Sequence, residues 1–180
     1  IYFNGNVDEK NVDNLINDIK NANKITEENG VIINPKPILI HINSKGGNVI
    51  DGMRFLSIFN LSLVPIATII DNYSFSAATF LSIHSPYRIM TKNSFCLIHY
   101  YSLTLFNSLK REELFSKMNE VESYFIKIID MYLKKTKLNK EDLYELFDRL
   151  FENDVPENLL PDIKKHFDMF IKKSVDYFDK

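Results

Sequence analysis

Ser76 and His99 are the residues of this chain whose types could support nucleophilic catalysis. A serine hydroxyl becomes a nucleophile when an imidazole takes its proton, a third group holds that imidazole, and two donors bind the oxyanion. Ser76 follows a strand-like run, 64–70, and opens a short apolar run predicted as a helix, 76–83. Free backbone N–H groups at a helix start suit oxyanion stabilisation. The same position also suits an ordinary N-cap, so Ser76 alone leaves both interpretations open.

A glycine pair precedes this serine by about thirty positions, in the segment 43–47, NSKGG. It follows the apolar run 38–42 and leads into the amphipathic run 49–59, which predicts a strand, a glycine turn and a helix start. Adjacent glycines allow close backbone approach and leave N–H groups free to bind an anion. By itself the pair is equally consistent with a simple turn.

The other three histidines have less specific surroundings. His41 lies in a strand run and is expected to be a packed or hydrogen-bonded core residue, whereas His84 and His166 are expected on the surface or in loops. By residue type alone, His99 is one of four possible bases.

The remaining pattern places these residues on alternating strands and helices. Further strands are predicted at 1–4, 87–90 and 95–98, and helices at 9–23, 49–60, 110–135, 139–152 and after Pro161, with Asp8 and Asn139 as N-caps. The polar segment 24–37 is predicted to be an exposed insertion. Strands that alternate with helices predict an α/β fold with a mostly parallel sheet.

Composition limits the class of protein. The chain has 180 residues, 45% hydrophobic, which suits one domain with a substantial core. Its net charge of -2 gives no electrostatic reason to expect nucleic acid. Its one cysteine, Cys96, excludes an internal disulfide and is expected to be buried. No metal-ligand motif and no membrane-length apolar run occurs, and any targeting segment is expected upstream of Ile1.

Three segments in order carry a specific resemblance: HINSKGGNVIDGM (41–53), ATIIDNYSFSAATFL (67–81) and KNSFCLIHY (92–100). They resemble the Clp protease proteolytic subunit family, peptidase S14, whose pattern is a strand ending in NSPGG, a nucleophile turn GxAASMG and a later PNSxxMIH. The resemblance covers about the first three quarters of the chain. It implies one ClpP-like domain over 1–180, with the repeated β-β-α units of the ClpP/crotonase fold. It also implies a protruding handle at about 100–135, through which two seven-membered rings stack, and C-terminal helices at about 139–180.

The resemblance implies roles for particular residues. Ser76 matches the nucleophile and His99 the base, and the backbone N–H groups of Gly47 and Ala77 match the oxyanion hole. It implies no cofactor and no metal.

The acid of the triad does not match. Two anchors, Thr136 with its following ExL and the pair PE at 156–157, both place the acid at Leu150, which follows an arginine as the family's acid usually does. Leucine cannot orient or stabilise an imidazolium, and losing the acid of such a triad costs about 10,000-fold in kcat. Asp148 or Asp154 could substitute only with a different backbone path.

Further departures concern the substrate path. Asn72 replaces a family glycine, Ser74 and Phe75 replace two alanines, and the bulky run 100–106, YYSLTLF, replaces a glycine-rich strand that pairs with substrate. Large side chains fill space that an added peptide strand needs.

These features predict a non-catalytic or very weakly active subunit, similar to the ClpR type that accompanies active ClpP in plastids. It would join a heptameric ring with its own copies or ClpP paralogues, beside a AAA+ chaperone that delivers unfolded polypeptide, with no nucleic acid and no membrane. A plastid-type (apicoplast-type) matrix is expected, with the mitochondrial matrix as the alternative.

Two other functions stay open. One is an active serine endopeptidase with a Ser76–His99 dyad and a displaced acid. The other is an acyl-CoA hydratase or isomerase, which shares the overall fold and also binds a thioester oxyanion with backbone donors.

Overall fold

The described part of the chain forms two compact units. This computed structural model describes residues 1–28, 31–99, 111–139 and 142, and for 111–122 it describes the backbone alone. The first unit is Ile1–Ile98 and the second is His99–Lys180. Ser76 and the glycine pair belong to the first unit, and His99 is the first residue of the second.

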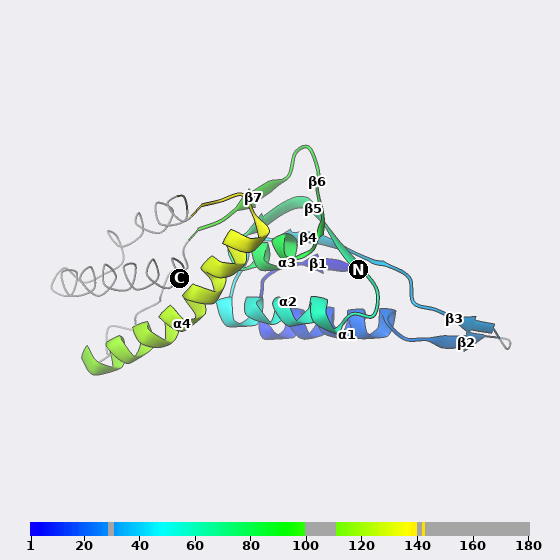
Figure 1. Ribbon diagram of the computed structural model, residues 1–180, viewed down its shortest axis with the longest axis horizontal. Helices are drawn as coiled ribbons and strands as arrows, with labels where there is room; N and C mark the ends of the chain where they lie inside the picture. The colour runs from blue at the N-terminus through cyan, green and yellow to red at the C-terminus, as the bar shows by residue number, and fades with distance from the viewer. Residues whose placement is uncertain (29–30, 100–110, 140–141, 143–180) are drawn as a thin grey trace. The chain divides into compact units, whose positions relative to one another are not determined.

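A five-stranded sheet forms the centre of the first unit (Figure 1). Its strands are β1 (Tyr2–Asn4), β4 (Ile38–Ser44), β5 (Ile66–Phe75), β6 (Tyr87–Met90) and β7 (Phe95–Leu97). The order is β1-β4-β5-β6, β7 also pairs with β5, and every pairing is parallel. The predicted α/β class with a mostly parallel sheet is confirmed. β5 runs five residues further than predicted, so it leads directly into Ser76.

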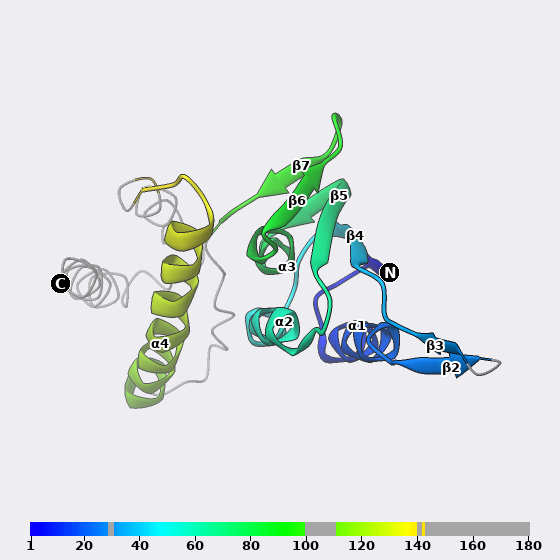
Figure 2. The same ribbon diagram turned by 45° about the vertical axis from the view of Figure 1, so that its right-hand side comes forward.

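Three helices cover one face of this sheet: α1 (Glu9–Ala22), α2 (Val49–Leu61) and α3 (Ala78–His84). Figures 1 and 2 show α1 and α2 side by side on that face. Along β4 the side chains of Ile38, Ile40 and Ile42 are buried, while the residues between them are more exposed. This period of two means that alternate residues of the strand pack under the helices. The core they form includes Phe55 of α2 and Leu81 of α3, both fully buried.

The segment predicted as an exposed insertion contains a β-hairpin. Its strands, β2 (Thr26–Glu28) and β3 (Val31–Ile33), pair antiparallel and reach away from the sheet (Figure 2). All their residues are exposed, so the predicted exposure is confirmed. The hairpin was not predicted, because neither short strand has a buried face to impose an alternating pattern.

The long helix α4 (Arg111–Lys135) belongs to the second unit and matches the helix predicted at 110–135. Its described side chains include a buried set: Phe125, Ile128, Ile129, Met131 and Tyr132. Asn139 Oδ1 accepts from the Asp142 N–H at 2.8 Å, as the predicted N-cap requires. The rest of that helix and the C-terminal helix lie outside the described residues. No helix in the described ranges is long and apolar enough to cross a membrane.

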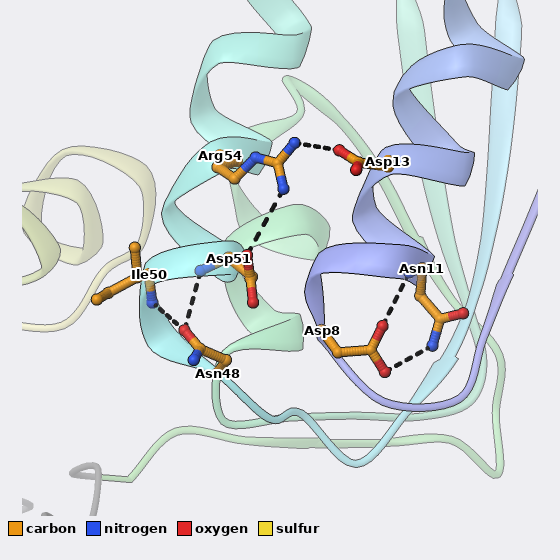
Figure 3. A network of polar contacts seen from close by, with 7 residues as sticks. All are labelled: Asp8, Asn11, Asp13, Asn48, Ile50, Asp51 and Arg54. Carbon is orange, nitrogen blue, oxygen red and sulfur yellow. Dashed lines mark hydrogen bonds and ion pairs between the residues drawn. The ribbon is translucent and has the colours of Figure 1, made fainter.

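Polar contacts fix the starts of α1 and α2 and tie the two helices together (Figure 3). The predicted cap of α1 is confirmed, since Asp8 Oδ1 accepts from the Asn11 N–H at 2.8 Å. Asn48 caps α2 by accepting from the N–H groups of Ile50 and Asp51 at 2.8 and 3.1 Å. Arg54 of α2 forms an ion pair with Asp13 of α1, and this bond raises the pKa of the guanidinium.

We expect Asn48→Ala to lower the free energy of unfolding by about 1 kcal/mol, because two helix N–H groups lose their acceptor. Asn14→Ala is the matched control, since Asn14 is exposed in α1 and alanine favours a helix interior. Urea unfolding followed by circular dichroism measures both changes. An equal effect of the two substitutions would contradict the capping role.

Candidate functional site

Ser76 occupies a strained turn between β5 and α3. Its φ of +52° is the one positive φ of a non-glycine residue in the described ranges, a conformation that costs about 1–3 kcal/mol unless its surroundings hold it. The Ser76 N–H donates to the Leu97 carbonyl at 2.8 Å, and the Ser76 carbonyl accepts from the N–H and Oγ1 of Thr79 at 2.9 and 2.5 Å. These bonds fix the turn on both sides of the serine.

The hydroxyl of Ser76 does not cap α3. The helix begins at Ala78 with Ala77 in the N-cap position and no side-chain cap bond, so the predicted helix start at Ser76 is wrong by two residues. The physical reason is the positive φ, which places Ser76 outside the helix. Within the described residues the hydroxyl makes no hydrogen bond, and the side chain is half-buried. The N-cap interpretation of Ser76 is therefore excluded.

The glycine turn packs directly against this serine. Gly46 has a φ of +91°, and a Cβ built on it would lie 2.5 Å from the Phe75 carbonyl oxygen and 2.7 Å from Ser76 Cβ. Atoms cannot approach so closely without displacement, so only glycine fits here. Gly47 has a φ of +152°, and its Cβ would collide with the backbone of Val7. The glycine pair is therefore more than a simple turn, because both glycines lie in close contact with other backbone segments.

Two backbone N–H groups, one in the glycine turn and one in the serine turn, have no acceptor within the described ranges. The chain on either side of Gly47 is engaged with Val7: the Val7 N–H donates to Gly46 at 2.9 Å and the Asn48 N–H to Val7 at 2.7 Å. The Gly47 N–H itself donates to nothing there, and neither does that of Ala77. The Ala77 nitrogen lies 3.2 Å from the built Cβ of Gly46. Free donors beside a hydroxyl are what an oxyanion hole requires.

His99 follows the edge strand β7. Its side chain is exposed, and within the described residues it forms no hydrogen bond or ion pair. The sequence positions considered for the acid, Leu150, Asp148 and Asp154, lie outside the described residues. All three residues of β7 are exposed, including Cys96, whose predicted burial is wrong. β7 pairs with β5 alone among the described strands.

Two of the other histidines, His41 and His84, lie in the described part of the chain. His41 Nδ1 is 2.9 Å from a carboxylate oxygen of Asp71, and its ring stacks on Tyr2 at 4.6 Å, so the hydrogen-bonded role predicted for it is confirmed. His84 was predicted at the surface or in a loop, but it is half-buried at the end of α3, with its ring 5.1 Å from that of Phe59. The prediction failed because the run 76–83 continues by one residue. His166 lies outside the described residues.

The substitution of the family glycine by Asn72 leaves the serine turn formed. Asn72 is an exposed residue within β5, and its φ is not positive. The β4–β5 register shifts here, since Ile42 pairs with Ile70 but Ser44 pairs with Ser74. The extra residues of β5 form a bulge that takes up the change.

Sequence reasoning missed one group at this site. Lys45 Nζ lies 6.0 Å from the centroid of the Tyr73 ring, which in turn lies 5.3 Å from the ring of Phe75. The available signal was the lysine in NSKGG at the place of the proline in the family pattern NSPGG.

Comparison with known proteins identifies the class. The Clp protease family model matches residues 4–157, and the chain therefore belongs to the Clp protease family. Its fold is similar to that of a ClpP1 point mutant from Listeria monocytogenes, with a TM-score of 0.66 at 16% identity over 81% of this chain and 76% of the other. It is also similar to the ClpP protease catalytic domain from Plasmodium falciparum, with a TM-score of 0.59 at 23% identity over 82% and 72%. No curated protein sequence matches.

The protein is thus a ClpP-like subunit with the mixed α/β fold of that family. At these identities the solved structures establish the fold alone. The single-domain boundaries and the handle role of α4 stay predictions.

We expect Gly46→Ala to destabilise the protein more than Gly5→Ala. Both glycines have positive φ, +91° and +104°, but the nearest atom to a Cβ on Gly5 is 3.7 Å away. Gly5→Ala therefore reports backbone strain alone, about 1–2 kcal/mol, and Gly46→Ala adds the collision with Phe75 and Ser76. Chemical unfolding measures both, and equal losses would mean that the contact beneath Ser76 is not tight.

Proposed function

We propose that this chain is a non-catalytic or very weakly active subunit of the ClpR type, which assembles into the heptameric ring of an ATP-dependent Clp protease complex. The observation that carries this proposal is the leucine at position 150, where the family has its acid. Without a carboxylate, the imidazole of His99 is neither oriented nor stabilised when it takes the serine proton.

Assembly is supported by the uncovered face of the sheet. Opposite the helices, the first unit exposes large apolar side chains: Tyr2 (68% exposed), Leu39, Tyr87 and Ile89. They lie on β1, β4 and β6, and β5, between β4 and β6, adds the half-buried Ala67 and Ile69 on the same face. Contiguous exposed apolar surface of this kind is typical of protein–protein interfaces. We infer that further copies or ClpP paralogues of the ring cover it, with a AAA+ chaperone supplying unfolded polypeptide.

The ClpR-type assignment also predicts the compartment in which the protein resides. We propose an organellar matrix, plastid-like (apicoplast-type), with the mitochondrial matrix as the alternative. Immunofluorescence of the tagged protein against markers of both organelles tests it, and a signal elsewhere would contradict it.

We expect the purified protein to hydrolyse fluorogenic peptides no faster than its Ser76→Ala variant. A serine-directed phosphonate probe should likewise leave Ser76 unlabelled, because no activated nucleophile is present. Turnover that the Ser76→Ala change abolishes would contradict the proposal.

Leu150→Asp should raise kcat/KM over the wild type, by up to about 10,000-fold if the missing acid is the sole defect. Leu150→Asn, of similar size but uncharged, is the matched control and should stay inactive. A gain with asparagine equal to that with aspartate would show that the charge is not what is missing.

A second candidate function is a working serine endopeptidase that uses Ser76 and His99. The strained φ of Ser76 favours it, because strain of this kind is kept mainly at functional sites. The free N–H groups of Gly47 and Ala77 also fit it. Native mass spectrometry before the peptidase assay separates the candidates: a heptamer without turnover supports the first, and turnover dependent on Ser76 the second.

A further inference from the structure

Lys45 is a cationic residue directly before the glycine that packs against Ser76. It is exposed, and its ammonium lies 6.0 Å from the centroid of the Tyr73 ring. At that distance the ring attracts the cation, at an exposed site by about 0.5–1 kcal/mol. Tyr73 is held in turn beside the half-buried ring of Phe75, at 5.3 Å. The aromatic pair thus restricts where the flexible lysine side chain lies.

The ammonium of Lys45 has no carboxylate partner in the described part of the chain. The two nearest carboxylates in the adjoining elements are engaged elsewhere: Asp51 of α2 with Arg54, and Asp71 of β5 with His41. A cation that no internal group neutralises can bind an external anion at little desolvation cost.

Lys45 is also joined through its chain neighbours to the segment that contacts Ser76. It directly precedes Gly46, whose built Cβ lies 2.7 Å from Ser76 Cβ and 3.2 Å from the Ala77 nitrogen. Gly47, with its free N–H, follows. The ammonium, two free N–H groups and the serine hydroxyl therefore come from two short segments in contact, 45–47 and 76–77. A cation and free backbone donors are the groups that bind a carboxylate.

We propose that Lys45 is a specificity-determining residue that binds a carboxylate of a peptide at the Ser76 site. The carboxylate is an Asp or Glu side chain or the C-terminus of a short peptide. The inference rests on the proposed function in assigning the N–H groups of Gly47 and Ala77 to the site. It needs no catalysis, because an anion can bind where no bond is cleaved. A peptide that ends at the site needs room on only one side of Ser76.

Fluorescence anisotropy with labelled decapeptides tests the proposal. One amidated pair differs only by Glu or Gln at the centre, and a second pair, without acidic side chains, differs only by a free or an amidated C-terminus. We expect the wild type to bind a carboxylate-bearing member about two- to fivefold more tightly, the range for a solvent-exposed ion pair. The preference should weaken as salt is raised from about 50 to about 500 mM, because the charges are screened. The first pair reports a side-chain carboxylate and the second a C-terminal one.

Lys45→Gln should abolish this preference, whereas Lys10→Gln, which removes an exposed lysine from α1, should keep it. Tyr73→Leu should weaken it, because the ammonium loses its aromatic support. Thermal melting of each variant confirms that it is folded.

A preference that Lys45→Gln leaves intact, equal affinity within both pairs, or no peptide binding at all would each overturn the inference. None of these results bears on the proposed function, which the peptidase assay and the ring mass decide. Conversely, turnover dependent on Ser76 would overturn the non-catalytic assignment and leave the role of Lys45 to the binding data.

Discussion

The contact between Gly46 and the Phe75–Ser76 backbone is the constraint on which the site depends. Two chain segments approach so closely there that no side chain fits between them. The contact holds Ser76 at a φ that serine otherwise avoids, because the strained turn is bonded on one side to Leu97 and pressed on the other by the glycine. Strain persists in a folded protein only where several such contacts maintain it.

Two features of helix α2 support this contact: its N-cap and its close packing on the serine turn. Asn48 caps α2 directly after the glycine pair, so the start of the helix fixes the path of residues 46 and 47. A Cβ on Gly52, one turn into α2, would lie 3.1 Å from Ala77 Cβ, so the helix itself packs closely on the serine turn. The contacts that hold the serine turn therefore also hold together the core of the first unit.

Sequence reasoning was most accurate where burial imposes a pattern. Strand β4 and helix α1 were predicted nearly to the residue, because their buried apolar positions follow the period of each element. Sequence reasoning failed where tertiary contacts decide the bounds or the pairing of a strand. The extension of β5 to Phe75 depends on pairing with β7, and the hairpin β2–β3 has no buried face. At the site, the roles of Ser76, Gly47 and Ala77 came from the resemblance, whereas the positive φ of Ser76 has no local signal in the sequence. The position of Lys45 over Tyr73 was marked only by a lysine in place of the family's proline.

The pairing of β5 with β7 has a consequence for how the first unit folds. The turn at Ser76 is clamped by a carbonyl that lies 21 positions later in the chain, and β7 completes the same edge of β5 that β6 begins. A chain that lacks β7 therefore also lacks the bond that fixes the serine. The serine turn is fixed only when nearly the whole of the first unit is available to fold.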